Sequence, residues 1–310
     1  MNNISRRSFL FGSTAVAAGA ALFGHEAFAV PASNVRRRYA LNPPTVKGYG
    51  LSFREQVRLA IAAGFDGLEP WLRDAHAAKA SGEFADAVKM AKDANFRFVN
   101  GIAFGSWSVD DPAKRAAGLE ETKRDMALLA EMGCPCIAAS MFGMQKPGTR
   151  KLPLETIAER YDAVCELGAK MGVRPLLEYW GHSANLYRPE DALWVAAKVG
   201  RPNTGVLADV YHTHRGGGSF ETYRYFSPAT LPVLHMNDYP STPEAAKLID
   251  ADRIWPGDGV APWRRIFAAL DEAGTNPWLS IELFNPSYWK SDALSTLKTA
   301  LAKMKAVAEG

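Results

Sequence analysis

The stretch "GVLADVYHTHRGGG" at residues 205–218 shows how this chain is built. An apolar run ends in a carboxylate at Asp209, and a polar segment with His212, His214 and three glycines follows it. A short apolar run that is closed by turn residues is typical of a buried strand. The polar residues after it are then either ligands at the end of that strand or members of a polar turn.

The same unit recurs along the chain from residue 46. Eight short apolar runs predict strands at 46–51, 67–71, 96–103, 136–140, 173–179, 204–209, 231–237 and 278–283. Amphipathic stretches between them predict helices at 52–63, 82–94, 113–132, 153–171, 188–199, 219–228, 261–272 and 290–308. Strict alternation predicts an α/β fold with a parallel sheet. No glycine-rich phosphate turn follows an early strand, which favours a single closed (β/α)8 TIM barrel over a doubly wound sheet.

The first residues have the features of an export signal. Arg6 and Arg7 precede Phe9, an apolar stretch and small residues up to Ala29, which resembles a twin-arginine signal peptide. We therefore expect a signal peptide at 1–29, a linker at 30–45 and the catalytic barrel at 46–310. The apolar stretch is shorter than the roughly 20 residues that span a bilayer, so cleavage and release are favoured over a membrane anchor. The twin-arginine export machinery would deliver a folded protein to the periplasm, without stable membrane association after cleavage.

Composition excludes several other classes of protein. The formal net charge of +3 is close to neutral for 310 residues, and the one dense basic run, Arg36 to Arg38, is typical of a solvated linker. We expect no nucleic-acid partner. Cys134, Cys136 and Cys165 are odd in number and lack the spacing of a redox pair, so we expect buried thiols.

Four chemically reactive side chains end successive predicted strands. They are Glu178, Asp209, His235 and Glu282, and each follows an apolar run, where burial is costly unless the group is paired or bound to a cation. Singly, each is equally typical of a helix cap, a rim charge or a core histidine. Together they lie at equivalent places in a barrel and predict one site for a divalent ion. Mixed oxygen and nitrogen donors favour Mn²⁺, with Mg²⁺, Co²⁺ and Zn²⁺ as alternatives.

At this point the ordered motifs carry a family resemblance. The segments "LEYWGH" (177–182), "DVYH" (209–212), "HMNDYP" (235–240), "WPGDG" (255–259) and "SIELFNPSYW" (280–289) resemble the sugar isomerase/epimerase family with a xylose isomerase-like barrel. The resemblance runs from about residue 46 to the end of the chain. It implies that Glu178, Asp209, His235 and Glu282 are the metal ligands, and that Glu178 and Glu282 are also the catalytic base and acid.

The resemblance also implies substrate contacts. His212, three residues after the metal aspartate, is expected to contact a substrate oxygen, whereas His214 is expected at the rim. Tagatose-type epimerases have an arginine and a second glutamate where this chain has Ser241 and Ala184, so the 3-epimerase activity does not follow. Arg253, just before "WPGDG", is a candidate in place of that arginine, although an exposed loop arginine is the alternative.

Other candidates come from strand ends. Trp71 and Trp107 are expected to form an apolar wall against a sugar ring, with core packing as the alternative. Glu69 ends the second predicted strand and is expected to bind a substrate hydroxyl or to pair with an arginine. Barrels of this kind commonly associate, so a homo-oligomer stays open.

These residues predict a metal-dependent isomerase or epimerase of an unphosphorylated sugar or keto-sugar. Proton transfer beside a carbonyl passes through an enediolate, which a chelating divalent cation stabilises while two glutamates move the proton. A lyase is the alternative, as in inosose dehydratases or keto-glycoside cleavage, and a hydroxypyruvate isomerase-like reaction would use the same site. A non-catalytic sugar-binding barrel is a further alternative.

Overall fold

Eight parallel strands form the centre of the molecule. The computed structural model describes residues 36–310, so the signal peptide and the first part of the linker lie outside the described residues. The strands are β1 (Arg38–Leu41), β2 (Gly67–Leu68), β3 (Arg97–Phe98), β4 (Cys136–Ser140), β5 (Arg174–Glu178), β6 (Gly205–Asp209), β7 (Val233–Met236) and β8 (Trp278–Ile281). They are paired in the order β3-β2-β1-β8-β7-β6-β5-β4. A parallel bridge between Gly101 and Ile137 joins the two ends, which confirms the closed barrel.

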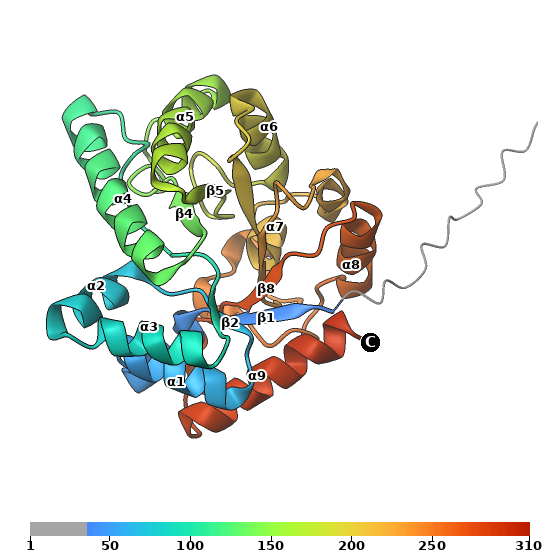
Figure 1. Ribbon diagram of the computed structural model, residues 1–310. Coiled ribbons are helices and arrows are strands. Elements are labelled where there is room, and N and C mark those ends of the chain that lie inside the picture. Colours follow the sequence, from blue (N-terminus) through green and yellow to red (C-terminus); the bar gives the residue numbers. More distant parts are fainter. Residues whose placement is uncertain (1–35) are drawn as a thin grey trace, which may run out of the picture. The chain divides into compact units, whose positions relative to one another are not determined.

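Helices surround the strands (Figure 1). They are α1 (Phe53–Ala63), α2 (Leu72–Ser81), α3 (Phe84–Asp93), α4 (Pro112–Met132), α5 (Leu154–Met171), α6 (Pro189–Val199), α7 (Val210–Arg215), α8 (Trp263–Glu272) and α9 (Ala293–Ala308). The starts of the helices were predicted from local capping signals, and the structure shows these capping interactions. Ser52 and Glu55 form a capping box before α1, and Asp111 accepts backbone hydrogen bonds at the start of α4. None of the helices within residues 36–310 combines the length and apolar character that crossing a membrane requires.

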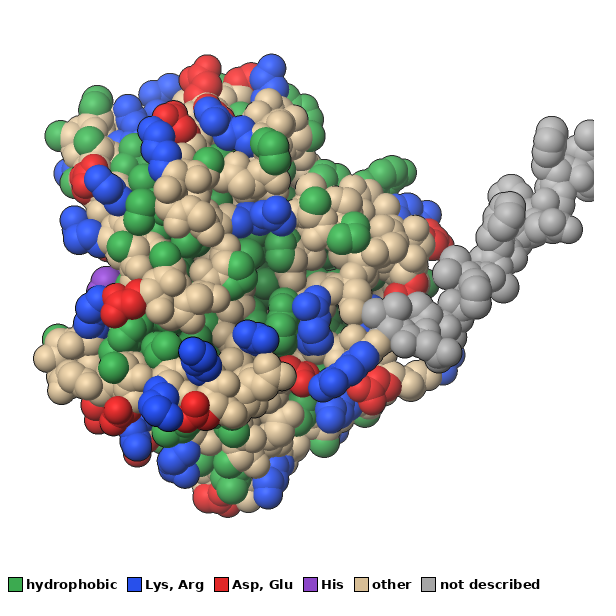
Figure 2. All heavy atoms as spheres, in the orientation of Figure 1, with side chains coloured by type: hydrophobic (Ala, Val, Ile, Leu, Met, Phe, Trp, Pro, Cys, Tyr) green, Lys and Arg blue, Asp and Glu red, His purple; other side chains and the backbone are tan. Residues whose placement is uncertain are grey.

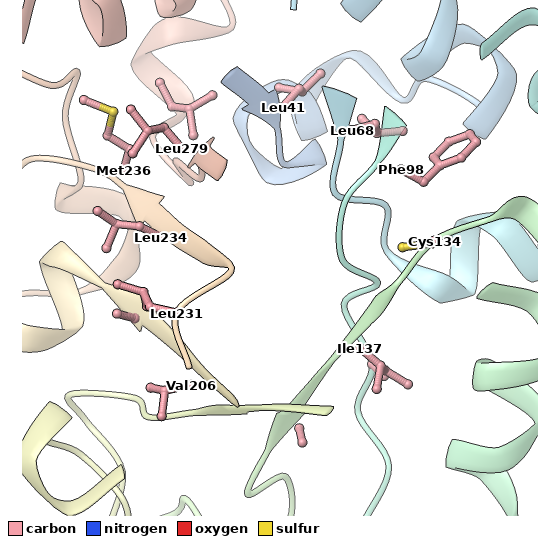
Figure 3. Packing of buried hydrophobic residues seen from close by; sticks show 14 of the residues in the cluster. Leu41, Leu68, Phe98, Cys134, Ile137, Val206, Leu231, Leu234, Met236 and Leu279 are labelled. Atoms are coloured by element: carbon pink, nitrogen blue, oxygen red, sulfur yellow. The ribbon is translucent and has the colours of Figure 1, made fainter. Parts of the chain in front are cut away.

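Successive side chains along each strand point alternately to two separate hydrophobic clusters. Leu177, Val206 and Leu234 belong to the large cluster that packs between the strands and the helices. Figure 3 shows Val206 and Leu234 among its members. Leu176 and Leu207 belong to a smaller cluster inside the barrel. Because side chains point to opposite faces with a period of two, the residue two positions after an interior leucine also points inward. This period directs the last residues of β5 and β6 into the barrel mouth.

The barrel begins earlier than the sequence predicted. The first strand is Arg38–Leu41, within the expected linker, and residues 46–51 are not a strand. Pro43 and Pro44 start a short 3-10 helix instead, since proline cannot donate to a strand ladder. Gly48 packs against the ring of Trp289, so closely that a Cβ there would lie 2.3 Å from it.

Two helices were not predicted, and one predicted helix is shorter and tighter. Residues 72–81 form α2, and residues 210–215 form α7 directly after β6. The expected helix at 219–228 is the 3-10 helix Phe220–Tyr225. All three lie in connections after strands, and α7 and the 3-10 helix, with six residues each, are too short to leave a clear apolar period.

The surface gives no sign of a single-charge patch on the face shown in Figure 2, where acidic and basic side chains are interspersed. A hollow of about 590 Å³ lies at the amino ends of the strands, lined by Arg38, Cys136, Arg174 and Trp278 among others. The acidic and imidazole residues identified above lie at the opposite, carboxyl ends.

All three cysteines are free and buried, as expected.

Candidate functional site

The barrel brings four side chains to one place. Glu178 and Asp209 end β5 and β6, His235 lies in β7, and Glu282 directly follows β8. Asp209 pairs in register with His235, and His235 pairs with Ser280, which lies two residues before Glu282. Glu178, Asp209 and His235 each lie two residues after a residue of the interior cluster, so their side chains point to the same inner face of the strands. The four functional side chains are nearly inaccessible to solvent, at 0% exposure for Asp209 and His235 and 5% for Glu178 and Glu282.

One nitrogen of His235 faces three carboxylates. Nδ1 lies 3.3 Å from Asp209 Oδ2, 3.3 Å from Glu282 Oε2 and 3.9 Å from Glu178 Oε1. This nitrogen is buried and has no hydrogen-bond partner. Potential ligand atoms of Asp209, His235 and Glu282 all lie within 4.8 Å of one another. An unpartnered buried imidazole nitrogen among carboxylate oxygens is the donor set of a divalent-cation site, so the residues present fit such an ion.

The electrostatics of the protein groups alone agree with this arrangement. Burial, with a contribution from Glu282, raises the pKa of Glu178 to about 8, although His235 opposes it. Burial also disfavours the charged forms of Asp209 and His235, but the neighbouring groups overcome it. His212, Arg253 and His235 lower the pKa of Asp209, and Glu69, Glu282 and Asp209 raise the pKa of His235. Several like charges packed together without water are costly unless a cation compensates them.

Arg253 is buried beside the cluster, which excludes the exposed-loop alternative. It is 1% exposed, and its Nη1 donates to Glu282 Oε2 at 2.8 Å and to Asp209 Oδ2 at 3.3 Å. Nη2 donates to Asp250 Oδ1 at 2.8 Å. The guanidinium also lies over the rings of Tyr211 and Phe284. These contacts stabilise the positive charge at the mouth of the barrel.

His212 lies next to Arg253 on the same side of the mouth. Its Nε2 accepts from Arg253 Nη2 at 3.1 Å, so the ring carries its proton on Nδ1, which is buried and has no partner. Burial, together with Arg253, lowers the pKa of His212 to about 3, although Asp209 opposes the shift. His212 is therefore a neutral ring with a buried N–H that has no hydrogen-bond partner. Its position follows from Asp209, whose carboxylate caps α7 by accepting from the His212 backbone.

The loop that carries Arg253 is anchored by Asp238. This buried carboxylate accepts from the backbone of Tyr239, Gly257 and Ala261, and from the indole of Trp263. Four donors hold both ends of the loop against one side chain. These hydrogen bonds fix the course of the loop and explain how Arg253, 18 positions after His235, reaches the site.

Aromatic rings form the other side of the mouth. Trp71 packs 5.4 Å from Phe104, which packs 5.5 Å from Phe142, and Phe284 lies 6.3 Å from Trp71. We call Trp71, Phe104, Phe142 and Phe284 the aromatic wall. Trp71 is tied to the cluster through Asn42, which accepts from the indole and donates to Glu282 Oε1 at 3.2 Å.

Two residues expected at the substrate lie elsewhere. Trp107 is 2% exposed and packs 5.9 Å from Tyr161 in the core between the strands and the helices, which is the core-packing alternative. Glu69 is fully buried below the mouth, where it contacts His235 rather than an arginine. His214 stacks on Tyr239 at 3.9 Å, beside the site rather than in it.

Sequence reasoning missed several contributors. Asn42 was hidden in the expected linker, and Asn237, which donates to Asp209 Oδ2 at 3.0 Å, was not distinguished from a turn residue. Asp250 and Phe284 are set by loop conformation, which the sequence alone does not reveal. The signal that could have found Asn237 is its place two residues after His235 in "HMND".

Comparisons with known proteins agree with this fold. Residues 57–307 match the family described as xylose isomerase-like TIM barrel, and residues 3–23 match the signal sequence of the twin-arginine translocation pathway. The chain is 29% identical over 192 residues to an inosose isomerase of Bacillus velezensis, which covers 61% of this chain and 68% of that relative. It is 24% identical over 193 residues to an inosose dehydratase of Yersinia enterocolitica, covering 54% and 64%.

Solved structures show the same barrel. A crystal structure of IOLI protein with a bound zinc atom superposes with a TM-score of 0.80 at 21% identity, covering 88% of this chain and 98% of that one. Matches to four inosose isomerases, that of Bacillus velezensis included, span between 48% and 68% of those proteins' own lengths. The family match covers most of the chain and includes Glu178, Asp209, His235 and Glu282. The chain belongs to the xylose isomerase-like TIM barrel family.

Proposed function

We propose that this protein is a divalent-cation-dependent isomerase or epimerase of an unphosphorylated sugar or keto-sugar, exported to the periplasm. The observation that carries the proposal is the buried Nδ1 of His235, which has no hydrogen-bond partner and faces Glu178, Asp209 and Glu282. The isomerase and dehydratase relatives support an enzyme of this chemistry.

Glu178, Asp209, His235 and Glu282 would hold the cation. When bound, the cation would polarise a substrate carbonyl and stabilise the negative charge that develops on its oxygen. Three carboxylates with one imidazole favour Mn²⁺ on ligand hardness, with Mg²⁺, Co²⁺ and Zn²⁺ as alternatives. A zinc ion in the related IOLI structure keeps zinc among them.

The protein's own groups would carry the proton. Glu178 and Glu282 both border the same small space, and one removes the proton beside the carbonyl while the other returns it, through an enediolate. The buried N–H of His212 and the guanidinium of Arg253 would bind substrate oxygens on one side. The aromatic wall would pack against the C–H face of the sugar and exclude water.

The export signal supports the choice of substrate. Residues 3–23 match the twin-arginine signal, and that route carries folded proteins, so the cation would be loaded before export. No glycine-rich phosphate cradle is apparent in the sequence, which favours an unphosphorylated substrate.

A dehydratase or other lyase is the second candidate. The match to an inosose dehydratase favours it, because an enediolate can also expel a substituent from the neighbouring carbon. A hydroxypyruvate isomerase-like reaction would use the same groups. A sugar-binding barrel without catalysis would keep the fold and lose the proton transfer.

One experiment separates these functions. Mn²⁺-loaded protein is incubated with inososes and keto-sugars in D₂O, and products are followed by NMR and mass spectrometry. Isomerisation would exchange the proton beside the carbonyl and leave the connectivity intact, whereas elimination would lose water or an alcohol. Glu178→Gln and Glu282→Gln should each reduce exchange by at least about 100-fold. Sugar binding without exchange in the unaltered protein would contradict an enzymatic role.

A further inference from the structure

The two ring nitrogens of His235 have different surroundings. Nδ1 faces the three carboxylates of the candidate metal site, whereas Nε2 lies 2.9 Å from Glu69 Oε2. Both side chains are completely buried. Because an ionised carboxylate can only accept, Nε2 must be the donor in this contact. The neutral ring then carries its proton on Nε2 and presents a lone pair at Nδ1.

The carboxylate of Glu69 is itself fixed by donors from three other parts of the barrel. Asn42 Nδ2 at 3.1 Å and the hydroxyl of Ser280 donate to Oε2, and Asn100 Nδ2 donates to Oε1 at 2.7 Å. With His235, four protein donors occupy the two oxygens. Both oxygens of Glu69 therefore accept from protein donors, and its orientation is set by Ser280 in β8 and by Asn42 and Asn100, which follow β1 and β3.

A buried carboxylate at this place needs a physical reason. Burial of an ionised group is costly, and a neutral side chain of the same shape would fill the space. What a carboxylate adds is a fixed negative charge on one side of an imidazole whose other side faces the metal site. Such a charge fixes the tautomer and increases the electron density that the ring offers to a cation.

We propose that Glu69 is a positioning residue of the metal centre, which orients His235 and strengthens Nδ1 as a ligand. The inference rests on the proposed function, since it assumes that the four side chains bind a divalent cation. It differs from the sequence-based expectation that Glu69 contacts the substrate. Glu69 acts through His235 and does not touch the reacting atoms.

The decisive variant is Glu69→Gln, because the barrel can accommodate it. The amide oxygen can still accept from His235 Nε2, and its NH₂ group can face Asn100, whose Oδ1 is buried without a partner and becomes available when that amide turns. The variant thus keeps the shape and the hydrogen bonds but removes the charge. Ser280→Ala is a milder second variant that removes one donor to Glu69.

The chain offers a matched control. His76 Nε2 lies 2.7 Å from the buried carboxylate of Asp125, on α2 and α4, which is a second carboxylate–histidine pair away from the barrel mouth. Asp125→Asn removes the charge from this pair, whose carboxylate is buried although the His76 side chain is 44% exposed. Any general effect of losing a buried carboxylate on folding should appear in both variants.

Metal affinity is the readout, measured on the full-length protein after chelation. Mn²⁺ is titrated by the EPR signal of the free ion, and Co²⁺ by its visible absorption, which reports ligand geometry. Relative to the unaltered protein, we expect Glu69→Gln to weaken Mn²⁺ binding about 10- to 100-fold and to change the Co²⁺ spectrum. Ser280→Ala should weaken it a few-fold, and Asp125→Asn should leave both readouts unchanged.

The measurements distinguish a failure of the Glu69 inference from a failure of the proposed function. If Glu69→Gln lowers the melting temperature but leaves the Mn²⁺ affinity and the Co²⁺ spectrum unchanged, Glu69 is only structural and this inference is overturned. An equal loss in Asp125→Asn would overturn it too. If the unaltered protein binds neither ion, the proposed function fails together with the inference.

Discussion

Arg253 and His235 contact the same two carboxylate oxygens. Arg253 Nη1 lies 3.3 Å from Asp209 Oδ2 and 2.8 Å from Glu282 Oε2, and His235 Nδ1 lies 3.3 Å from each of these atoms. A guanidinium therefore shares the carboxylates with the proposed cation site. Its positive charge compensates part of their negative charge and also repels a cation.

Removal of this charge should change metal binding and catalysis in opposite directions. We expect Arg253→Met to tighten Mn²⁺ binding by at least about tenfold, because two like unit charges about 4 Å apart repel by about 4 kcal/mol at an effective dielectric constant near 20. The same variant should lower kcat/KM for the sugar by about 100-fold, since a charged substrate contact is lost. Calorimetric titration and steady-state kinetics test this, with Arg265→Met, at an exposed arginine paired with Glu221, as the control. Weaker Mn²⁺ binding would contradict the prediction.

The metal-free protein should become less stable as the pH rises. Burial raises the pKa of Glu178 from its ordinary 4.5 to about 8, so its stabilising contribution is complete below pH 4.5 and is lost as the pH approaches 8. The raised pKa of His235 has the same sign, whereas the lowered pKa of His212 opposes the decline below its ordinary value of 6.5 and leaves it unopposed above that pH. Thermal unfolding of chelated protein at pH 5 and pH 8 should show this decline, and Glu178→Gln should reduce it.

Cation binding should depend on the same proton. Below about pH 8 the cation must displace a proton from Glu178, so affinity should rise with pH over the range from 5 to 8. Calorimetry in buffers of different ionisation enthalpy would count the released protons. A pH-independent affinity with no proton release would show that Glu178 is not a ligand.

The aromatic wall should contribute to substrate binding and not to metal binding. Phe142 is its outermost ring and is 40% exposed. Phe142→Ala should raise KM for a sugar by about 5- to 10-fold, which corresponds to the loss of about 1–1.5 kcal/mol of ring contact, with Mn²⁺ affinity unchanged. Tyr225→Ala, at a ring that is 72% exposed on the 3-10 helix Phe220–Tyr225, is the matched control and should leave KM unchanged.

Gly259 should be required for the position of Arg253. A Cβ at this residue would lie 2.3 Å from Asp238 Oδ1 and 2.3 Å from the Tyr239 carbonyl oxygen, and Asp238 is fixed by its other donors. Gly259→Ala should destabilise the protein by about 1–3 kcal/mol and raise KM, because the loop must shift. Gly217→Ala, at a glycine with positive φ and no atom within 4 Å of its Cβ, should cost only about 1–2 kcal/mol of backbone strain and leave KM unchanged. Denaturant unfolding and kinetics compare the two.

The sequence predicted most of the strands and helices because their local signals are strong. Predicted helices at 113–132, 153–171 and 188–199 lie within a residue of α4, α5 and α6, each of which has a proline or a glycine at its boundary. The first strand was misplaced because "RYAL" follows a basic run and has only four residues. A strand this short is defined by its partners, β2 and β8, rather than by its own composition.

The residues of the candidate site were also predicted only in part. Glu178, Asp209, His235 and Glu282 could be named because they directly follow apolar runs, and a closed parallel barrel places all such residues at one end. Trp107 was wrongly assigned to the substrate wall, since a loop residue points into the core or the mouth according to its backbone conformation. The hydrogen-bond partners of Glu69 come from four different strands or the segments after them, so no local sequence pattern could predict them.

The sequence by itself determined the alternation of strands and helices, the identity of the four convergent side chains and the export signal, because these depend on periodicity and local composition. Only the tertiary structure decided that Arg253 is buried against Glu282, that Glu69 supports His235 and that Trp107 belongs to the core. Those outcomes depend on contacts between residues far apart in the chain, and the distances that govern hydrogen bonds and charge pairs are set only when the barrel closes.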